Sequence, residues 1–145
     1  KIFRESQLPS IPTNEEDIKF EDFKLLGIDF IITGSLTNED KFNISASYQV
    51  FNVQKEKKIR TSKIFGIPNK LRQLAHYISD GIYEEITGLK GVASTKLLYV
   101  TENINDDKII FNLVVADSDG SNEQILLKSS EPIISPSWSP DSKCP

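Results

Sequence analysis

The sequence contains no methionine, a single cysteine (Cys144) and a single histidine (His76). A structural zinc site needs four ligands, which two such residues far apart in the chain cannot supply. One cysteine also excludes an internal disulfide, so cysteine usage says nothing about the redox compartment. Because methionine is absent and the chain begins with Lys1, we expect this end to be a processed terminus or the edge of a fragment.

Long apolar runs and an excess of basic residues are also absent. No run approaches the roughly 18 apolar residues that a membrane-spanning helix needs, so no direct membrane insertion is expected. The net charge of -4 argues against a nucleic-acid surface, and Glu56 interrupts the lysines of the stretch 55–58, which is typical of a solvated hairpin tip. With 38% hydrophobic residues, the chain can bury a core. Its 145 residues allow one domain, or one domain and a piece of another.

The first elements that the sequence predicts are a short helix and a buried strand. Residues 13–26 begin with the capping residues Thr13 and Asn14, continue with three acids that favour a helix N-terminus, and are followed by Gly27 as a C-terminal cap. The apolar run "IDFIITGSL" at 28–36 then predicts a strand buried on both faces.

The clearest strand signal is the alternation in "KFNISASYQVFNV", residues 41–53. The apolar positions of this period of two predict a core face, and the residues between them a solvated face. The core-face residues are Phe42, Ile44, Ala46, Tyr48 and Val50. The alternation slips at Val50-Phe51, which suggests a bulge or a second packing surface. The segment "KIRTSKIFG" at 58–66 is the expected antiparallel partner.

The period then changes to that of a helix. Pro68 suits the start of this helix and Gly88 its end. The charges at its ends oppose the helix dipole, so packing of an apolar stripe must hold the helix. The stripe consists of Leu71, Leu74, Ala75, Ile78, Ile82 and Ile86.

From Gly91 onward the sequence predicts only β-structure. The runs "TKLLYVTE" and "KIIFNLVVAD" are followed by a tight turn at Asp119-Gly120 and by "NEQILLKSS". Short strands with regular turns are typical of a sandwich or a propeller. We place a domain boundary near Gly91-Val92.

Two patterns suggest chemistry, and each has a simpler structural interpretation. His76 and Asp80 share a helix face with Arg72 and could form an acid–base pair, but no motif places a nucleophile beside them and G-x-S-x-G is absent. A polar stripe that hydrogen-bonds to a neighbouring element explains the same residues. "DSDGSN" at 117–122 offers calcium-type oxygens, yet it lacks the spacing of an EF-hand loop and suits a hairpin turn. We therefore predict no catalytic, cofactor-binding or metal-binding residue.

The carboxyl-terminal segment "SPSWSPDSK", residues 135–143, places Trp138 between two prolines. One aromatic residue per repeat, flanked by polar turn residues, is typical of propeller blades. The motif indicates such a blade without any attached chemistry.

Together with this motif, the stretch "LRQLAHYISDGIYEEITGLKGVASTKLLYV" resembles the TolB family of the Tol-Pal system, in which a helix runs into a strand with this pattern. The matching positions are Leu71, Arg72, His76, Ser79, Asp80, Thr87, Gly88, Gly91, Thr95, Tyr99 and Val100. The resemblance implies an α/β amino-terminal domain at residues 1–91, with a mixed sheet, two helices and the first strand missing. Residues 92–145 would be the first, incomplete blade of a six-bladed propeller.

Two departures from the family pattern bear on this region. Ser142 stands where the blade turn of the family usually has glycine, and the chain offers few residues beyond it. About 40 to 45 residues form one blade, so the segment after Gly91 makes little more than one. We expect its apolar face to lack cover, and the segment to be poorly ordered alone or to pair with the first domain or another chain.

The function that the resemblance implies is non-enzymatic. The family works in the periplasm between TolA and the lipoprotein Pal, where it maintains outer-membrane integrity and supports invagination of that membrane during division. The resemblance also implies that the signal peptide and the amino terminus that engages TolA are missing here, as is most of the surface that binds Pal. The main alternative is the propeller of a serine peptidase, which would need a downstream hydrolase domain. A solute- or carbohydrate-binding sandwich is a third possibility, although one tryptophan is few for such a pocket.

Overall fold

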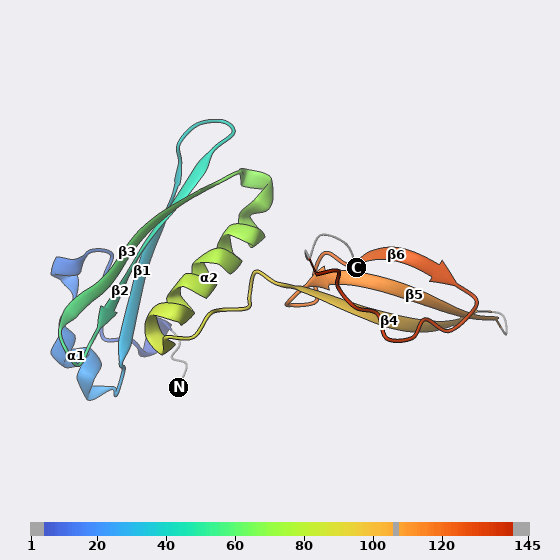
Figure 1. Ribbon diagram of the computed structural model, residues 1–145. Helices are drawn as coiled ribbons and strands as arrows, with labels where there is room; N and C mark the ends of the chain where they lie inside the picture. The colour runs from blue at the N-terminus through green and yellow to red at the C-terminus, as the bar shows by residue number, and fades with distance from the viewer. Residues whose placement is uncertain (1–4, 106–107, 141–145) are drawn as a thin grey trace. The chain divides into compact units, whose positions relative to one another are not determined.

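The computed structural model describes residues 5–105 and 108–140 and divides the chain into two compact units, one ending at Lys90 and one starting at Gly91 (Figure 1). Each unit contains a three-stranded antiparallel sheet among its described residues. The order of elements within each unit follows from the sequence patterns, with differences that have physical causes.

The first difference concerns the helix expected at 13–26. The structure has a 3-10 turn η1 (Glu5–Gln7), a second turn η2 (Glu15–Asp17) and a short helix α1 (Phe20–Leu25). Ile18 separates η2 from α1 because it turns into a hydrophobic cluster and takes an extended backbone. The end of the predicted helix is confirmed, since Gly27 adopts a φ of 68° directly after it.

The sheet of the first unit has the order β1-β2-β3, formed by β1 (Phe30–Asn38), β2 (Ile44–Asn52) and β3 (Lys57–Gly66). Residues 39–43 and 53–56 connect the strands, and such short connections join only antiparallel neighbours, because a parallel pair needs a crossover of a dozen or more residues. The described strands of this sheet are therefore antiparallel throughout.

The second difference concerns which strand is buried. The apolar run that contains β1 was expected to be buried on both faces, but β1 lies at an edge and is exposed along most of its length. The central strand β2 is the buried one. An edge strand has a neighbour on one side only, so its apolar side chains lose half of their cover.

The core face and the bulge predicted for β2 are confirmed, but the solvated face is wrong: Ser45 is buried and Ser47 and Gln49 are half-buried. Val50 pairs with Arg60, whereas Phe51 pairs with Lys58, so that one extra residue of β3 is accommodated between them. Ile44, Ala46, Tyr48 and Val50 are buried as expected. Phe42 is the third difference: its side chain is 71% exposed because it lies in the turn before β2 rather than in the strand.

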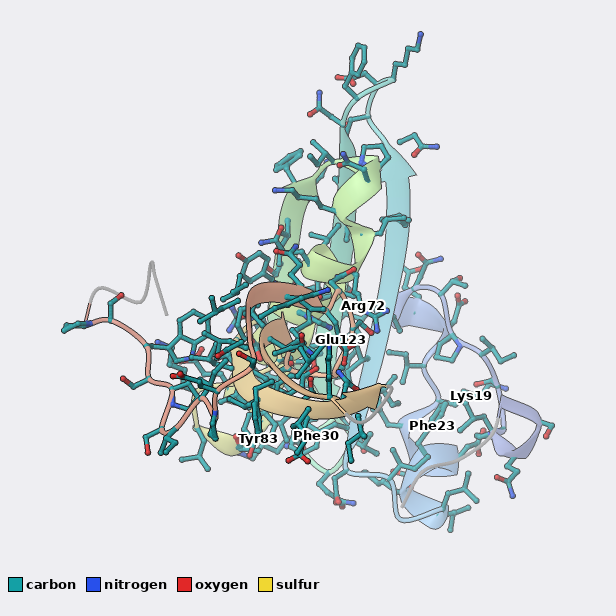
Figure 2. All side chains as sticks on the ribbon, turned by 90° about the vertical axis from the view of Figure 1, so that its right-hand side faces the viewer. Lys19, Phe23, Phe30, Arg72, Tyr83 and Glu123 are labelled. Atoms are coloured by element: carbon teal, nitrogen blue, oxygen red, sulfur yellow. The ribbon has the colours of Figure 1, made fainter. Side chains whose placement is uncertain are left out.

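Helix α2 (Leu71–Thr87) begins after a 3-10 turn η3 (Pro68–Lys70) and ends at Gly88, which has a left-handed φ of 72°. Both predicted ends are thus confirmed. Leu74 and Ile78 pack against Ile44, Ala46 and Ile64 of the sheet, over which the helix lies in Figure 1. A second hydrophobic cluster, to which Phe23 of α1 belongs (Figure 2), is built from Ile18, Phe23, Ile31, Phe51 and Val53.

The second unit has the strand order β4-β5-β6, with β4 (Lys96–Asn105), β5 (Lys108–Asp117) and β6 (Gln124–Ser129). All three strands lie where the sequence predicts them, and Gly120 supplies a φ of 79° in the turn before β6. Residues Leu97, Ile104, Ile109, Ile125, Leu126 and Leu127 are exposed large hydrophobic side chains of this sheet. Asp141, Ser142 and Cys144 lie outside the described residues. Within the described ranges, no helix is long and apolar enough to cross a membrane.

Candidate functional site

The polar residues that were predicted to share one face of the helix at 71–87 do lie along one face of α2. Arg72 (labelled in Figure 2), His76 and Asp80 follow one another at one-turn intervals along the helix. Each takes part in a polar interaction, so none of the three is without a partner. That the stripe hydrogen-bonds to a neighbouring element, rather than forming an acid–base pair, stays a prediction.

A more strongly built polar cluster lies between α2 and the sheet. Tyr48 of β2 is buried, and its phenol hydrogen-bonds to the Arg60 guanidinium of β3. Arg60 Nη1 also donates to Glu85 Oε2 of α2 at 3.2 Å. The hydrogen bond that Arg60 donates to the Glu85 carboxylate is the largest cause of a pKa of Arg60 above its already high ordinary value, and Tyr48 contributes further. This arrangement clamps the helix onto the sheet.

Gly81 of α2 makes room for this cluster. A Cβ atom built on Gly81 would stand 2.6 Å from the hydroxyl oxygen of Tyr48, closer than real Cβ contacts come. The sequence analysis took Tyr48 only as an apolar strand residue and did not single out Arg60. A glycine inside an otherwise regular helical pattern is the signal that could have indicated a close approach at this point.

The turn between β1 and β2 is organised by one carboxylate. Asp40 Oδ1 accepts hydrogen bonds from the backbone nitrogens of Phe42 at 2.7 Å and Asn43 at 2.9 Å, and Oδ2 accepts from Asn43 Nδ2 at 2.8 Å. The Asn43 amide is the largest cause of a lowered pKa of Asp40, because the bonds favour the charged form. Asn43 belongs to this turn, in which its Nδ2 is bonded to Asp40.

A second acidic residue of this turn ties it to the sheet. Glu39 Oε1 accepts a hydrogen bond from the buried Ser45 at 2.5 Å and lies 2.7 Å from the Lys63 ammonium. The bond to Lys63 lowers the pKa of Glu39, with a further contribution from Ser45. Both carboxylates of the turn are thus bonded within the fold.

The calcium-like segment at 117–122 is a hairpin connection. The Asp117 carboxylate accepts hydrogen bonds from the Lys96 ammonium and from Asn122 Nδ2, the latter at 2.6 Å. The bond from Lys96 is the largest cause of the lowered pKa of Asp117. Asp119 Oδ1 instead accepts from the Ser121 nitrogen at 3.0 Å, so the two carboxylates serve different partners. Within residues 5–105 and 108–140, no three His, Cys, Asp or Glu side chains are grouped to hold a metal ion.

A cavity of about 520 Å³ lies at one end of the second sheet. Two isoleucines, two lysines and two serines line it, and none of them belongs to the polar clusters described above. Its lining is Lys108, Ile109, Ile110, Lys128, Ser129 and Ser130. The polar clusters described above support turns or join α2 to the sheet.

Two family models match the chain. The TolB amino-terminal domain matches residues 1–59, and the TolB beta propeller domain matches residues 83–144. The match to both agrees with the α/β domain and the first strands of a propeller that the sequence analysis expected.

Curated relatives and a solved structure extend these matches over nearly the whole chain. The Tol-Pal system protein TolB of Alcanivorax borkumensis is 42% identical over 134 residues, covering 92% of this chain and 31% of the relative. The same protein of Hahella chejuensis is 40% identical, covering 95% and 32%. The crystal structure of TolB from Acinetobacter baumannii matches with a TM-score of 0.85 at 29% identity, covering 97% of this chain and 35% of that one. The chain thus spans about a third of the length of these proteins.

Proposed function

The chain belongs to the TolB family, and on that premise we propose that it is part of a non-enzymatic protein that links TolA to Pal in the periplasm. In this role it helps to maintain the outer membrane and to draw it inward during cell division. The single observation that carries the proposal is the 42% identity to a Tol-Pal system protein over 92% of the chain.

The two units supply different parts of this proposal. We assign residues 1–91 to the amino-terminal domain and residues 92–145 to the start of the propeller. Both family models and the similarity to the Acinetobacter baumannii structure support the assignment. The described polar clusters form hydrogen bonds and ion pairs within each unit. This is compatible with a protein that acts by binding partner proteins through its surface.

Direct binding tests the proposal. Pal and the carboxyl-terminal domain of TolA are immobilised separately, and this chain is compared with the mature full-length protein from the same source. We expect the full-length protein to bind both partners, and this chain to bind each more weakly, because the resemblance places most of both contact surfaces outside it. If the full-length protein bound neither Pal nor TolA, the proposal would be wrong.

The peptidase alternative has its own assay. Full-length protein is incubated with a panel of fluorogenic peptides and with an active-site-directed fluorophosphonate that labels nucleophilic serines. We expect neither cleavage nor labelling. Stoichiometric labelling of a serine, accompanied by peptide cleavage, would show that the protein is a serine peptidase and would contradict the proposed linking role.

A further inference from the structure

The turn between β1 and β2 presents an exposed aromatic ring on a braced backbone. The side chain of Phe42 is 71% exposed, although phenylalanine is among the side chains that gain most from burial. Its nitrogen donates to Asp40 Oδ1 at 2.7 Å, and the backbone nitrogens of Glu39 and Asp40 donate to the Asn43 carbonyl oxygen at 3.0 and 3.2 Å. A group that is already ordered loses little conformational entropy when a partner covers it, so this turn is preorganised for binding.

Two more exposed apolar side chains lie at the same end of the first unit. Ile44 pairs with Gly66, and the chain leaves β2 and β3 directly beyond this pair, through the turn on one side and through Ile67 on the other. Figure 1 shows the β1–β2 turn and the start of α2 at this end. Ile67 is 40% exposed, and Leu71, the first residue of α2, is 46% exposed. This end of the unit therefore offers apolar contacts from the turn and from the start of the helix.

The charges available to a partner at this end are positive. Lys41 and Lys70 are exposed, and neither forms an ion pair with an acid among residues 5–105 and 108–140. Lys41 Nζ lies 6.0 Å from the ring centroid of Phe42, so one cation stands beside the exposed ring. The two acids of the turn are already bonded within the fold, one to Lys63 and the other to the turn itself. The partner that complements this surface is therefore acidic.

The chain enters and leaves the first unit at the other end. The segment that precedes β1 packs around Phe51 and Val53, which lie at the end of β2 and just beyond it. The chain leaves the unit at Lys90, after the last turn of α2, whereas the surface contains the first residue of that helix. The surface is thus built from an internal turn and a helix start, away from both connections.

We propose that this end of the first unit, which we call the hairpin-tip surface, binds an acidic segment of a partner protein that also carries apolar side chains. The ring of Phe42 is the anchor that the partner covers, since aromatic residues are enriched at the centres of interfaces. The lysines pair with the carboxylates of the segment, which directs association and makes it sensitive to salt. The residues of the surface are Lys41, Phe42, Ile67, Lys70 and Leu71.

Two short synthetic peptides test the chemistry of the partner. One alternates glutamate with leucine, and its counterpart has lysine in place of glutamate. Fluorescence anisotropy of the labelled peptides measures their affinity for this chain at low and high salt. We expect the acidic peptide to bind about tenfold or more tightly than the basic one, and its affinity to fall as salt rises, because the surface presents cations.

Three variants test whether the acidic peptide binds at the hairpin-tip surface. Phe42→Ala removes the anchor and Lys41→Glu reverses a charge beside it, and each should weaken binding by about tenfold or more. Lys55→Glu is the matched control, because it reverses an exposed lysine in the β2–β3 turn, at the opposite end of the sheet. It should leave the affinity nearly unchanged. Circular dichroism confirms that each variant retains its fold.

Amide chemical shifts locate the peptide on the chain. Titration with the acidic peptide should move the resonances of residues 39–43 and 67–72, both in this chain and in the full-length protein. No binding of the acidic peptide, equal binding of the basic one, shifts confined to other residues, or an equal effect of Lys55→Glu would overturn the proposal. Binding to phosphatidylglycerol vesicles in place of the peptide would overturn it as well, and would indicate a lipid surface. None of these results bears on TolA or Pal, whose binding is measured separately.

Discussion

Gly81 of α2 lies over the phenol of Tyr48 so closely that a methyl group has no room: its Cβ would stand 2.6 Å from the hydroxyl oxygen. Tyr48 is 3% exposed and its hydroxyl is bonded to Arg60, so the ring cannot easily move aside. At this point the helix approaches the sheet closely because Gly81 has no side chain.

Replacing Gly81 by alanine is expected to destabilise the first unit, although alanine favours a helix. The gain in helix propensity is about 1 kcal/mol, whereas an extra methyl in a packed interface costs roughly 1 to 3 kcal/mol. We expect a net loss of about 1 kcal/mol in the free energy of unfolding. Urea unfolding followed by circular dichroism measures this difference.

The Tyr48→Phe background serves as the matched control. Without the hydroxyl, the next atom of the ring is 3.8 Å from the added methyl, which is an ordinary contact. Gly81→Ala should then be neutral or stabilising. A stabilising effect in the wild-type background would show that the phenol is free to move.

The clamp beneath Gly81 shows what the sequence could and could not predict. Period-two alternation found β2 and its bulge, and helical spacing with Pro68 and Gly88 found α2, because these patterns are local. Strand order is decided by long-range pairing, and for this reason the run containing β1 was wrongly placed in the interior. The role of Arg60 in the clamp was not predicted for the same reason: its partners lie in β2 and α2 and not next to it in the chain.

Two phenylalanines that the sequence places close together should respond very differently to truncation. Phe51 is fully buried, with its ring centroid 6.4 Å from that of Phe20, whereas Phe42 is exposed in a turn. We expect Phe51→Ala to lower the free energy of unfolding by about 3 to 5 kcal/mol. Phe42→Ala should change it by no more than about 0.5 kcal/mol. Similar losses in the two variants would show that the turn packs against other residues in solution.

Acidification should weaken the second unit through protonation of Asp117. The Lys96 ammonium and the Asn122 amide hold the pKa of this carboxyl below its ordinary value, so its charged form is favoured by folding. A lowered pKa contributes stability that is present above the ordinary value, about 3.9, and is lost as the pH falls through the lowered pKa.

Asp117→Asn tests this pH dependence. The variant should be less stable than the wild type near neutral pH, and the difference should shrink as the pH falls below about 4. Glu131→Gln, which removes an exposed acid of the same unit, is the control and should leave the pH profile of stability nearly unchanged. A difference between Asp117→Asn and wild type that is constant with pH would contradict the assignment.

The end of α2 depends on the backbone of Gly88. Its φ of 72° is unfavourable for any residue with a Cβ, and its nitrogen donates to the Glu84 carbonyl oxygen at 2.8 Å. No other atom lies within 4 Å of the position of an added Cβ, so substitution tests the backbone alone. We expect Gly88→Ala to cost about 1 kcal/mol in thermal unfolding, and Gly88→Asn to cost less, since asparagine tolerates this conformation better. Equal stability of all three proteins would argue against the left-handed cap.

The division of the chain at Lys90 and Gly91 has a spectroscopic consequence. Trp138 is the single tryptophan of the sequence and belongs to the second unit, so tryptophan fluorescence reports on the unfolding of that unit. Circular dichroism sums the helix of the first unit and the sheets of both. Where the units unfold independently, the two signals will give different midpoints, and one free energy of unfolding will not describe the chain. A mutation in the first unit can then go unnoticed by the fluorophore even when it melts α2.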